Sequence, residues 1–376
     1  MTPERVLIHG MSEYLGGREK FIMELYRRLD KSRIQFDFIC DNRKGKLVYE
    51  EEILSAGGRI FVLPPVREKP LVHLQRWKEI YRNKPYRAIY CHANRKLKTA
   101  AFFRYARQAG VPIRILHSHN SDDLKDRSTF RQILEKTAAV EWRRCVTHRF
   151  SCSRKAGEWM FGKTADFRVI PNAIDTERFD LDSEKRERIR TREGVTGHRV
   201  YGTVARISPE KNPLFLAEVF YEIHRLQPDS VFWLIGEGNL EAELREKISS
   251  LGVGESFRLL GRKENVDEYL NGMDVFLLSS IHEGFPITLV EAQASGLPCL
   301  VSDKVTEEVA ITDNVVFLPL SAGPQEWAEK ATALSSRDRS SRKEALKEKG
   351  FNLDDLVKDF TFFILNEFHP RNRTCP

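Results

Sequence analysis

The 376-residue sequence has no hydrophobic run long enough to cross a membrane, which takes roughly 18 or more apolar residues. Its first ten residues, MTPERVLIHG, also lack the apolar region of a secretory signal peptide. We therefore expect a cytoplasmic protein. A disordered composition is absent too, because 41% of the residues are hydrophobic and 31% are charged. The length favours two domains over a single core.

Cysteine is scarce and scattered. No two of the six cysteines form a CxxC pair; they are Cys40, Cys91, Cys145, Cys152, Cys299 and Cys375. This spacing favours free thiols in a reducing compartment over the alternatives, a zinc site or a disulfide framework. The sequence also shows no internal repeat, no low-complexity tract and no nucleic-acid recognition motif.

The net charge of +7 conceals an asymmetry along the chain. Residues 1–170 carry 35 Lys and Arg against 19 Asp and Glu, a net of +16, whereas residues 171–376 carry a net of −9. A basic half followed by an acidic half suggests two domains with different partners. The basic half suits a membrane surface, a nucleic acid or a phosphorylated substrate.

Short apolar runs alternate with helical patterns in both halves, which predicts two doubly wound domains with parallel sheets. In the first half the expected strands are 5–9, 36–40, 59–63, 88–91, 113–117 and 149–152, with helices at 19–29, 71–82 and 97–109. The second half predicts strands at 199–204, 231–235, 257–259, 275–278 and 299–301, with helices at 213–227 and 287–295. We also expect a solvated helix over 183–193 and an amphipathic one over 353–368.

Ligands in such sheets bind beyond the carboxyl ends of the strands, so the loops there hold the candidate residues. Gly16-Gly17 opens a helix after the first strand and suits a phosphate, although a structural turn is an equal alternative. Arg206 and Lys211 follow the first strand of the second half and suit a diphosphate; solvated surface cations are the alternative. Glu283 and Glu291 suit sugar and ribose hydroxyls, although Glu291 also fits a structural helical charge.

Together these motifs resemble the retaining glycosyltransferases of family 4, which have the GT-B fold. The resemblance spans nearly the whole chain and rests on five motifs: the glutamate pair Glu283 and Glu291 eight positions apart, the loop from Arg206 to Glu210-Lys211-Asn212-Pro213, Gly16-Gly17, Gly236-Glu237-Gly238, and Ile170-Pro171-Asn172-Ala173-Ile174-Asp175.

A narrower likeness is to the bacterial branch that builds capsular polysaccharide and exopolysaccharide. It rests on three segments, 115–121, 152–162 and 302–309. Two positions depart from the broader family: Ala173 replaces the glycine of Pro-Asn-Gly, and Val305-Thr306 replaces a Gly-Gly pair. The second departure leaves the role of Glu307 unassigned.

The resemblance implies two Rossmann-like domains facing across a cleft. Residues 1–172 would form the acceptor-side domain, 173–352 the nucleotide-sugar domain, and 353–376 a C-terminal helix and tail that packs back on the first domain. It implies transfer of a hexosyl or N-acetylhexosaminyl group from a nucleotide sugar with retention at the anomeric carbon. A UDP-sugar is the favoured donor, and a GDP-sugar is the alternative. No cofactor and no metal are implied. The only Asp-x-Asp sequence, Asp180-Leu181-Asp182, lies before a charged helix, away from the predicted strand ends.

The resemblance also assigns roles to single residues. His117 and His119, at the end of a strand, and Glu283 are the expected catalytic residues; His92, at another strand end, is a weaker candidate. The expected donor-binding residues lie in glycine-rich and charged loops: Gly16, Gly17, Arg206, Lys211, Gly236, Arg262, Glu283, Gly284, Phe285, Pro286, Ile287, Thr288, Leu289 and Glu291.

The expected acceptor is a lipid-linked diphosphate or a saccharide in polysaccharide assembly, and no nucleic acid is expected as a partner. Basic residues of the first half could face anionic headgroups at the inner face of the plasma membrane. They form two groups, Arg95, Lys96, Lys98, Arg104 and Arg107, and Arg143, Arg144 and Arg149. A solvated basic face is the alternative. Two other functions stay open, a nucleotide-sugar epimerase with the same fold and a non-catalytic polyanion-binding protein.

Overall fold

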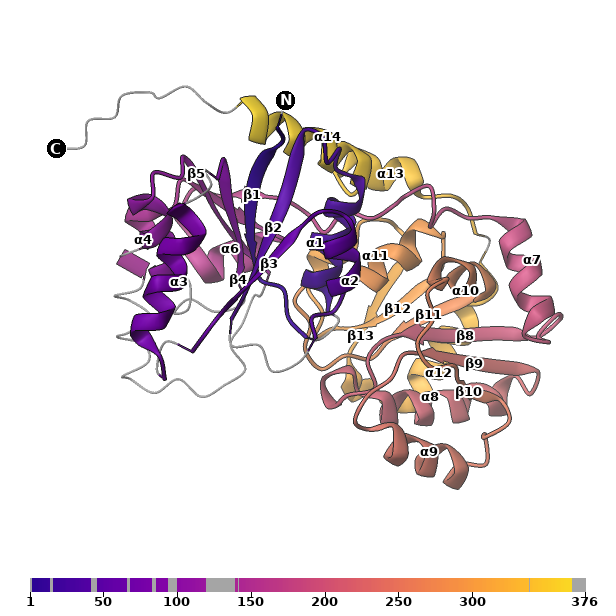
Figure 1. Cartoon of the computed structure of the whole chain (residues 1–376). Helices are drawn as coiled ribbons and strands as arrows, with labels where there is room; N and C mark the ends of the chain where they lie inside the picture. The colour runs from indigo at the N-terminus through magenta and orange to yellow at the C-terminus, as the bar shows by residue number, and fades with distance from the viewer. Residues whose placement is uncertain are drawn as a thin grey trace. The chain divides into compact units, whose positions relative to one another are not determined.

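The computed structural model describes residues 2–13, 16–41, 46–65, 68–82, 86–93, 100–119, 139–140, 142–337 and 339–366. The chain divides into two compact units (Figure 1). The first contains the chain up to Ala173 together with a C-terminal helix, and the second contains Ile174–Asn352. Within the described residues, no helix combines the length and the apolar character that crossing a membrane requires.

The first unit is built on a parallel sheet that, in the described residues, has seven strands in the order β3-β2-β1-β4-β5-β6-β7. The strands are β1 (Glu4–His9), β2 (Ile34–Asp41), β3 (Arg59–Leu63), β4 (Ala88–Ala93), β5 (Ile113–Ser118), β6 (His148–Ser151) and β7 (Arg168–Val169). The helices are α1 (Gly17–Arg28), α2 (Glu50–Ser55), α3 (Pro70–Arg82), α4 (Ala100–Gln108), α6 (Arg154–Phe161) and α14 (Leu353–Asn366).

The second unit repeats this plan with six described strands in the order β10-β9-β8-β11-β12-β13, again parallel. The strands are β8 (Arg199–Val204), β9 (Ser230–Ile235), β10 (Phe257–Leu259), β11 (Val275–Leu278), β12 (Cys299–Ser302) and β13 (Val315–Leu318). The helices are α7 (Ser183–Arg192), α8 (Pro213–Leu226), α9 (Glu241–Ser250), α10 (Val266–Gly272), α11 (Ile287–Ala294), α12 (Gly323–Leu334) and α13 (Lys343–Glu348), with short 3₁₀ turns η2 (Pro209–Lys211), η3 (Glu307–Val309) and η4 (Leu320–Ala322).

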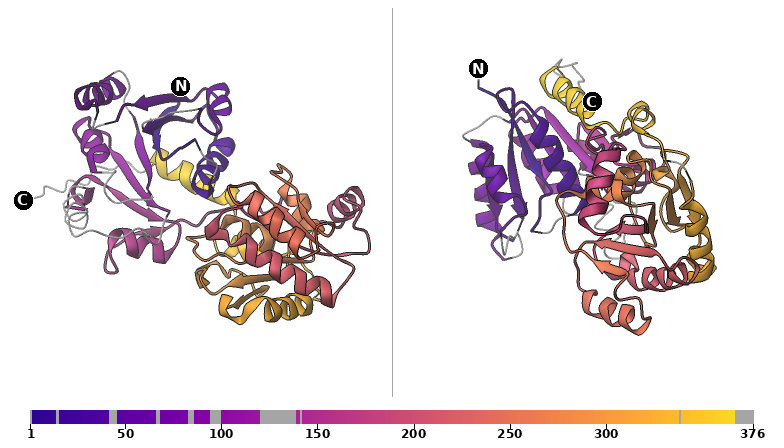
Figure 2. Two further views of the ribbon diagram at one scale, coloured as in Figure 1. Left: turned by 90° about the horizontal axis from the view of Figure 1, so that it is seen from below. Right: turned by 90° about the vertical axis from the view of Figure 1, so that its right-hand side faces the viewer.

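Helices cover both faces of each sheet, as the further views show (Figure 2). In the first unit, one core contains side chains of α1, α2 and α14, and the other those of α3, α4 and α6. In the second, α10 and α11 contribute to one core and α8, α9 and α12 to the other. The predicted doubly wound architecture is therefore confirmed for both units.

Helix α14 belongs to the first unit although it ends the described chain. Phe360 is 6% exposed and lies between Phe36 and Tyr90, with ring centroids 6.0 and 5.6 Å away. Arg87 donates to the carbonyl of Ile364 at 3.0 Å, which satisfies one acceptor in the last turn of the helix. Apolar burial and capping together hold α14 on this unit.

Candidate active site

The order of each sheet reverses direction at one point, between β1 and β4 in the first unit and between β8 and β11 in the second. Loops diverge at such a switch point, so ligands of doubly wound sheets bind beyond the carboxyl ends of the two strands that flank it. The residues expected to be catalytic lie at the carboxyl ends of these strands and of their neighbour β5, or in the loops that follow.

In the second unit, the switch point brings Lys211 and Glu283 together. The ammonium of Lys211 forms an ion pair with Oε1 of Glu283, and the hydroxyl of Ser280 donates to the same oxygen at 3.0 Å. The two charged side chains are 22% and 11% exposed. A cation and a carboxylate that are 72 positions apart in the sequence thus form one half-buried site.

The loop that carries Lys211 is held on both sides. On one side, the hydroxyl of Ser279 donates to the carbonyls of Lys211 and Asn212, both at 3.1 Å, and the Ile281 N–H donates to the Glu210 carbonyl at 2.9 Å. Asn212 has a φ of +54°, a left-handed conformation that asparagine tolerates better than most residues. The loop therefore reaches α8 in a fixed geometry.

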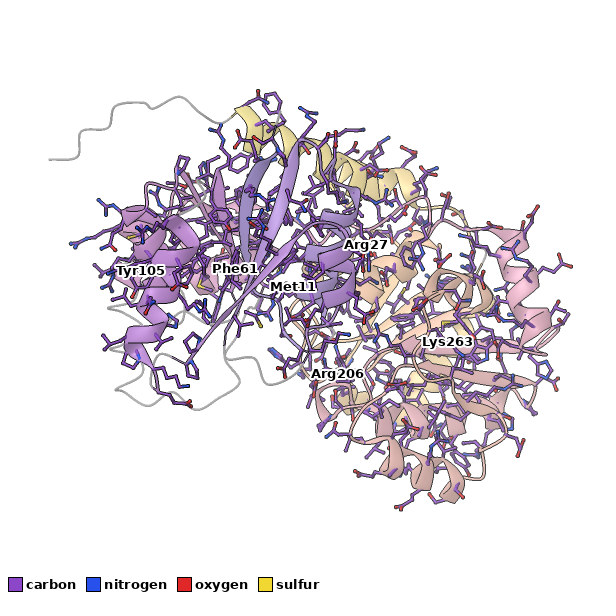
Figure 3. All side chains as sticks on the ribbon, in the orientation of Figure 1. Met11, Arg27, Phe61, Tyr105, Arg206 and Lys263 are labelled. Atoms are coloured by element: carbon purple, nitrogen blue, oxygen red, sulfur yellow. The ribbon has the colours of Figure 1, made fainter. Side chains whose placement is uncertain are left out.

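On the other side, the turn Gly236-Glu237-Gly238 packs against the segment that contains Arg206 (labelled in Figure 3). The Ala205 and Ile207 N–H groups donate to the carbonyls of Ile235 and Glu237, each at 3.0 Å. The Gly236 N–H donates to Gly261 at 2.9 Å, and the Arg262 N–H lies 3.4 Å from a carboxylate oxygen of Glu237. Arg206, Gly236 and Arg262, all predicted donor residues, thus lie on three connected loops.

The remaining predicted donor residues form the entry to α11. Gly284, Phe285 and Pro286 lead into the helix, and Phe285 stacks on Phe351 at 5.8 Å between ring centroids. Ile287 and Thr288 form its first turn.

Two later residues of α11 are buried. The side chain of Leu289 is fully buried in the core, and its backbone N–H donates to the Pro286 carbonyl at 3.2 Å. The side chain and the N–H of Leu289 therefore both contribute to the packing and hydrogen bonding of α11. Glu291 follows on α11 and is 1% exposed. A carboxylate buried this deeply needs polar or charged partners, which also suits the structural alternative for this residue.

In the first unit, three histidines gather at the carboxyl ends of β4 and β5. His92 and His117 are direct neighbours across the two strands, and His119 follows β5. Nδ1 of His92 lies 2.8 Å from Nε2 of His119, and the Tyr90 hydroxyl lies 2.7 Å from Nδ1 of His117. One ligand atom from each histidine lies within 4.8 Å of the others, so this cluster could hold a metal ion.

Burial controls the protonation of these histidines. Because desolvation disfavours the imidazolium, the pKa of His117 falls to about 3. The pKa values of His92 and His119 are also well below the usual value, first through burial and then through neighbouring histidines and Arg18. All three side chains are therefore neutral near pH 7 and can act as hydrogen-bond donors or acceptors, or as ligands.

Gly16 and Gly17 lie at the start of α1 in the same unit. Gly16 is the N-cap, and its carbonyl accepts the first helical hydrogen bond from Lys20 at 3.0 Å. Glu19 is 4% exposed; it accepts from Ser12 at 2.8 Å and pairs with Arg18 at 2.5 Å. The helix start thus already carries a buried carboxylate on its positive end.

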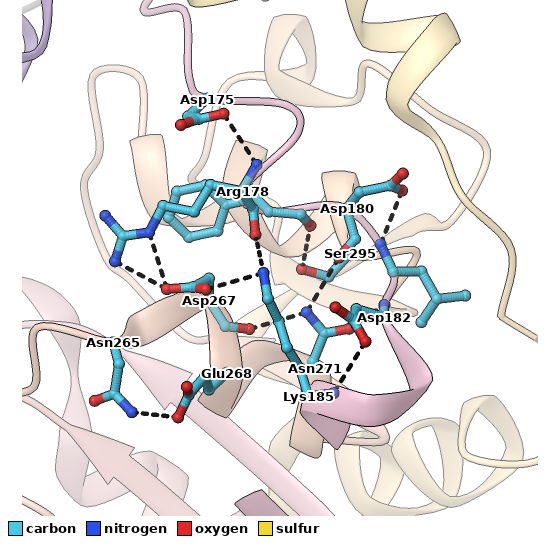
Figure 4. Close-up of polar contacts among 12 residues, drawn as sticks. Asp175, Arg178, Asp180, Asp182, Lys185, Asn265, Asp267, Glu268, Asn271 and Ser295 are labelled. Atoms are coloured by element: carbon cyan, nitrogen blue, oxygen red, sulfur yellow. Dashed lines mark hydrogen bonds and ion pairs between the residues drawn. The ribbon is translucent and has the colours of Figure 1, made fainter. Parts of the chain in front are cut away.

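Both carboxylates of the Asp180-Leu181-Asp182 sequence accept hydrogen bonds within the second unit (Figure 4). Asp182 caps α7 by accepting from the Lys185 N–H at 3.0 Å, and Asp180 accepts from the Ser341 hydroxyl at 2.6 Å. Lys185 also pairs with Asp267 at 3.2 Å. Asp182 thus caps α7, and Asp180 connects the segment before this helix to Ser341.

Helix α7 corrects one prediction in part: Arg188 and Arg192 are exposed, as expected of a solvated helix, whereas Arg186 and Arg190 are largely buried. Arg186 and Arg190 contact Asp274, which is 6% exposed, at 2.5 and 3.2 Å. Arg186 also donates to the carbonyls of Gly272 and Met273 at 3.1 and 2.8 Å. The high charge of this segment serves a half-buried ion network.

Sequence reasoning missed Ser279, Ser280 and Tyr90. The two serines come directly after β11, at the strand end where ligand and loop contacts gather, so their position was a usable signal. Tyr90 lies two residues before His92, and side chains two apart in a strand share a face. Its contact with His117 depends on which strand lies next to β4, and local sequence does not show this.

The two basic groups of the first half are only partly described. Arg95, Lys96 and Lys98 lie outside the described residues. Arg104 and Arg107 are exposed on α4, Arg143 and Arg144 are exposed as well, and Arg107 donates to the Arg144 carbonyl at 3.4 Å. Arg107 of the first group thus contacts Arg144 of the second, and Arg149 lies in β6.

Family models match both halves of the chain: "Glycosyltransferase Family 4" over residues 15–178 and "Glycosyl transferases group 1" over residues 185–352. The putative glycosyltransferase EpsF of Bacillus subtilis is 34% identical over 95% of each chain. An Escherichia coli UDP-Gal:α-D-GlcNAc-diphosphoundecaprenol α-1,3-galactosyltransferase is 27% identical over 77% of this chain and 76% of its own.

Solved structures share the fold at lower identity. Anabaena Alr3699/HepE, solved in complex with UDP, superposes with a TM-score of 0.75 at 17% identity and covers 95% of this chain and 98% of its own. WaaG, a glycosyltransferase involved in lipopolysaccharide biosynthesis, gives a TM-score of 0.67 at 14% identity, with 96% and 100% covered. These likenesses confirm the predicted GT-B fold.

Proposed function

Because the chain belongs to the glycosyltransferases with the GT-B fold, we propose that it transfers a sugar from a UDP-sugar donor. The pairing of Lys211 with Glu283 at the second switch point carries this proposal. In this pair, a cation suited to a diphosphate lies beside a carboxylate suited to sugar hydroxyls. The pair follows the strand ends at which nucleotides bind in such sheets. The UDP in the HepE structure and the UDP-Gal in the name of the E. coli relative support the choice of base.

The proposed mechanism needs no metal. Arg206 and Lys211 stabilise the charge that develops on the departing diphosphate, a task that a bound cation performs in metal-dependent enzymes. On donor binding, Lys211 exchanges part of its contact with Glu283 for a phosphate oxygen. Glu283 is then available to accept from sugar hydroxyls, which makes it a positioning carboxylate and not a nucleophile. His117 and His119 supply neutral imidazoles for sugar contact or proton relay.

We propose retention at the anomeric carbon by attack from the face that the diphosphate leaves. The α-1,3 linkage in the name of the E. coli relative is the outcome expected of a retaining enzyme that acts on an α-linked donor. The same name includes diphosphoundecaprenol, and two other relatives are named for biosynthesis of the Vi polysaccharide and of the lipopolysaccharide core. A lipid-linked diphosphate sugar in exopolysaccharide or capsule synthesis is therefore the proposed acceptor class.

The donor proposal is tested by binding before transfer is assayed. Thermal shifts with a panel of UDP- and GDP-sugars should show the largest stabilisation for one UDP-sugar, since ligands that bind only the native state raise its stability. Lys211→Met should weaken binding of that sugar about 10- to 100-fold, because a charge-assisted hydrogen bond contributes about 1.5–3 kcal/mol. Lys330→Met, on the exposed face of α12, is the matched control and should bind like the wild type.

Transfer to a polyprenyl-diphosphate sugar then tests the reaction itself. NMR of the product should show the anomeric configuration of the donor, and activity should survive extensive treatment with EDTA. An inverted product would refute retention, and loss of activity that Mg²⁺ or Mn²⁺ restores would refute metal independence. Equal donor binding by the Lys211→Met and wild-type proteins would refute the assignment of the site.

The adjoining basic residues of α4 and the Arg143–Arg144 pair support a second, separable proposal, peripheral binding to the inner face of the plasma membrane. Each cation near an anionic surface adds about 1 kcal/mol, so sedimentation with anionic liposomes should be strong at low salt and weak at moderate salt. Binding that is absent, or that does not respond to salt, would refute this proposal and leave the transfer reaction unaffected.

A further inference from the structure

The three histidines of the first unit form a compact cluster of nitrogen atoms. His92 and His117 face the same side of neighbouring strands, and His119 comes from the segment that continues β5 past the sheet. Ring centroids lie 5.4 Å apart for His92 and His117, 5.1 Å for His92 and His119, and 4.1 Å for His117 and His119. Each histidine contributes one ligand atom within 4.8 Å of the others.

The surroundings hold these rings in place. Phe21 contacts all three, with centroid distances of 5.9, 5.5 and 5.5 Å. Gly10 makes room for His92, because a Cβ at position 10 would lie 2.8 Å from both the Cβ and the carbonyl oxygen of His92. The cluster is therefore a built feature of the switch point and not a chance meeting of surface side chains.

One nitrogen atom of the cluster has no hydrogen-bond partner in the part of the chain that the structure describes. Nδ1 of His117 is used by the Tyr90 hydroxyl at 2.7 Å, while Nε2 is buried with no hydrogen-bond partner among the described residues. The His117 side chain is fully buried, so water does not easily satisfy this nitrogen. An unsatisfied buried polar atom is costly and calls for an explanation, such as a ligand that the atom binds.

We propose that His92, His117 and His119 form a three-histidine site for a zinc-class divalent transition-metal ion. Nitrogen ligands without carboxylates select such ions over Mg²⁺ and Ca²⁺, which require oxygen. Zn–N bonds of about 2.0–2.1 Å place tetrahedral ligand nitrogens about 3.4 Å apart. The present separations, 2.8 Å for one pair and within 4.8 Å for all, require only small ring movements.

Two further features suit a metal. Burial keeps the imidazoles neutral, which is the form that binds metals. Tyr90 can supply the outer partner that metal-bound histidines usually have: with Nδ1–H of His117 donating to the Tyr90 oxygen, Nε2 keeps the lone pair that would bind the ion. Three protein ligands leave a fourth position open, as in sites where zinc also holds water or another small ligand.

The metal would engage the same histidines to which the proposed function assigns sugar contact or proton relay. This consequence rests on the proposed function: a bound ion makes these imidazoles unavailable for the transfer reaction. Micromolar Zn²⁺ should therefore inhibit an enzyme that needs no metal. Metal binding can be measured without transfer, so the failure of one proposal is distinguishable from the failure of the other. UDP-sugar binding at the second unit's switch point provides a third, independent readout.

The test measures metal binding by the full-length chain after treatment with EDTA. Competition with a chromophoric chelator should show one tightly bound Zn²⁺ per chain, and Co²⁺ should give the intense visible bands of a tetrahedral nitrogen site. His92→Ala, His117→Ala and His119→Ala should each weaken Zn²⁺ binding on the order of 100-fold. Tyr90→Phe should weaken it about 10- to 100-fold, the usual effect of losing an outer partner.

His224→Ala is the matched control, since this histidine lies on α8 in the second unit and is only partly buried. It should bind Zn²⁺ like the wild type. The Co²⁺ spectrum of the wild type needs no variant and keeps the test decisive if a histidine variant fails to fold. The proposal is overturned if the wild type shows no stoichiometric Zn²⁺ binding, if Co²⁺ gives only weak octahedral bands, or if the histidine variants bind like the control.

Discussion

A single methyl group at Gly238 should disturb the loop that carries Arg206. The turn that contains Gly238 crosses this loop at backbone-to-backbone distance: Ile207 donates to the Glu237 carbonyl at 3.0 Å, and Leu240 donates to the Ile207 carbonyl at 3.1 Å. A Cβ on residue 238 would lie 2.1 Å from the Ile207 carbonyl oxygen and 2.6 Å from its carbon. Because both partners are backbone, the overlap in Gly238→Ala is relieved only if one loop moves by about 1 Å.

The cost follows from that geometry. Overpacking of this kind costs about 1–3 kcal/mol, and each of the two backbone hydrogen bonds that the shift stretches contributes about 1 kcal/mol. We expect Gly238→Ala to lower the free energy of unfolding by about 2–4 kcal/mol. A misplacement of about 1 Å in a substrate-holding loop can reduce activity about 100-fold, so kcat/KM should fall by a similar factor.

Urea denaturation and UDP-sugar titration measure the two effects on the same preparations. Gly254→Ala is the control, because a Cβ there meets no atom within 4 Å, and it should leave stability and donor binding within error or slightly improved. The reasoning is refuted if Gly238→Ala unfolds within about 0.5 kcal/mol of the wild type and binds the donor equally well. A stability loss of the same size in Gly254→Ala would also refute it.

Two further substitutions test the packing of each unit. Asp274→Ala in the second unit leaves the half-buried Arg186 and Arg190 without their carboxylate and should lower the free energy of unfolding by about 3–5 kcal/mol in urea denaturation. Phe360→Ala in α14 should cost about 3–5 kcal/mol because it empties a buried aromatic site, whereas Phe362→Ala, 70% exposed on the same helix, should cost less than about 0.5 kcal/mol.

The ion-pair prediction has its own control. Glu241→Gln on α9 removes the carboxylate of an exposed pair with Arg245, 37% and 61% exposed, and should change stability by no more than about 1 kcal/mol. An equally small change in Asp274→Ala would show that the α7 network adds nothing to stability. An equal loss in Phe360→Ala and Phe362→Ala would show that α14 is not held by its buried face.

Most strands of both sheets could be predicted because parallel strands, buried on both faces, are continuous apolar runs between polar turns. β3, β8, β10 and β11 have the predicted bounds. β13 was missed although its sequence, VVFL, has the same character. Helix α7 was predicted with nearly correct bounds, but the burial of Arg186 and Arg190 against Asp274 was not predicted. Its sequence shows many charges, and nothing local shows that Asp274, more than 80 residues later, receives two of them.

Local sequence alone determined the element types, the doubly wound class, and the loops that follow strands, because periodicity, turn residues and glycines act over a few positions. Only the tertiary structure decided which strands flank the switch points. Sheet order brings Lys211 to Glu283, and Tyr90 and His92 to His117, from positions 72, 27 and 25 residues apart in the chain. Contacts at such separations depend on which strands pair, and no local pattern specifies that choice. The motif residues could therefore be predicted one by one, whereas the ion pair and the close approach of the three histidines required the fold.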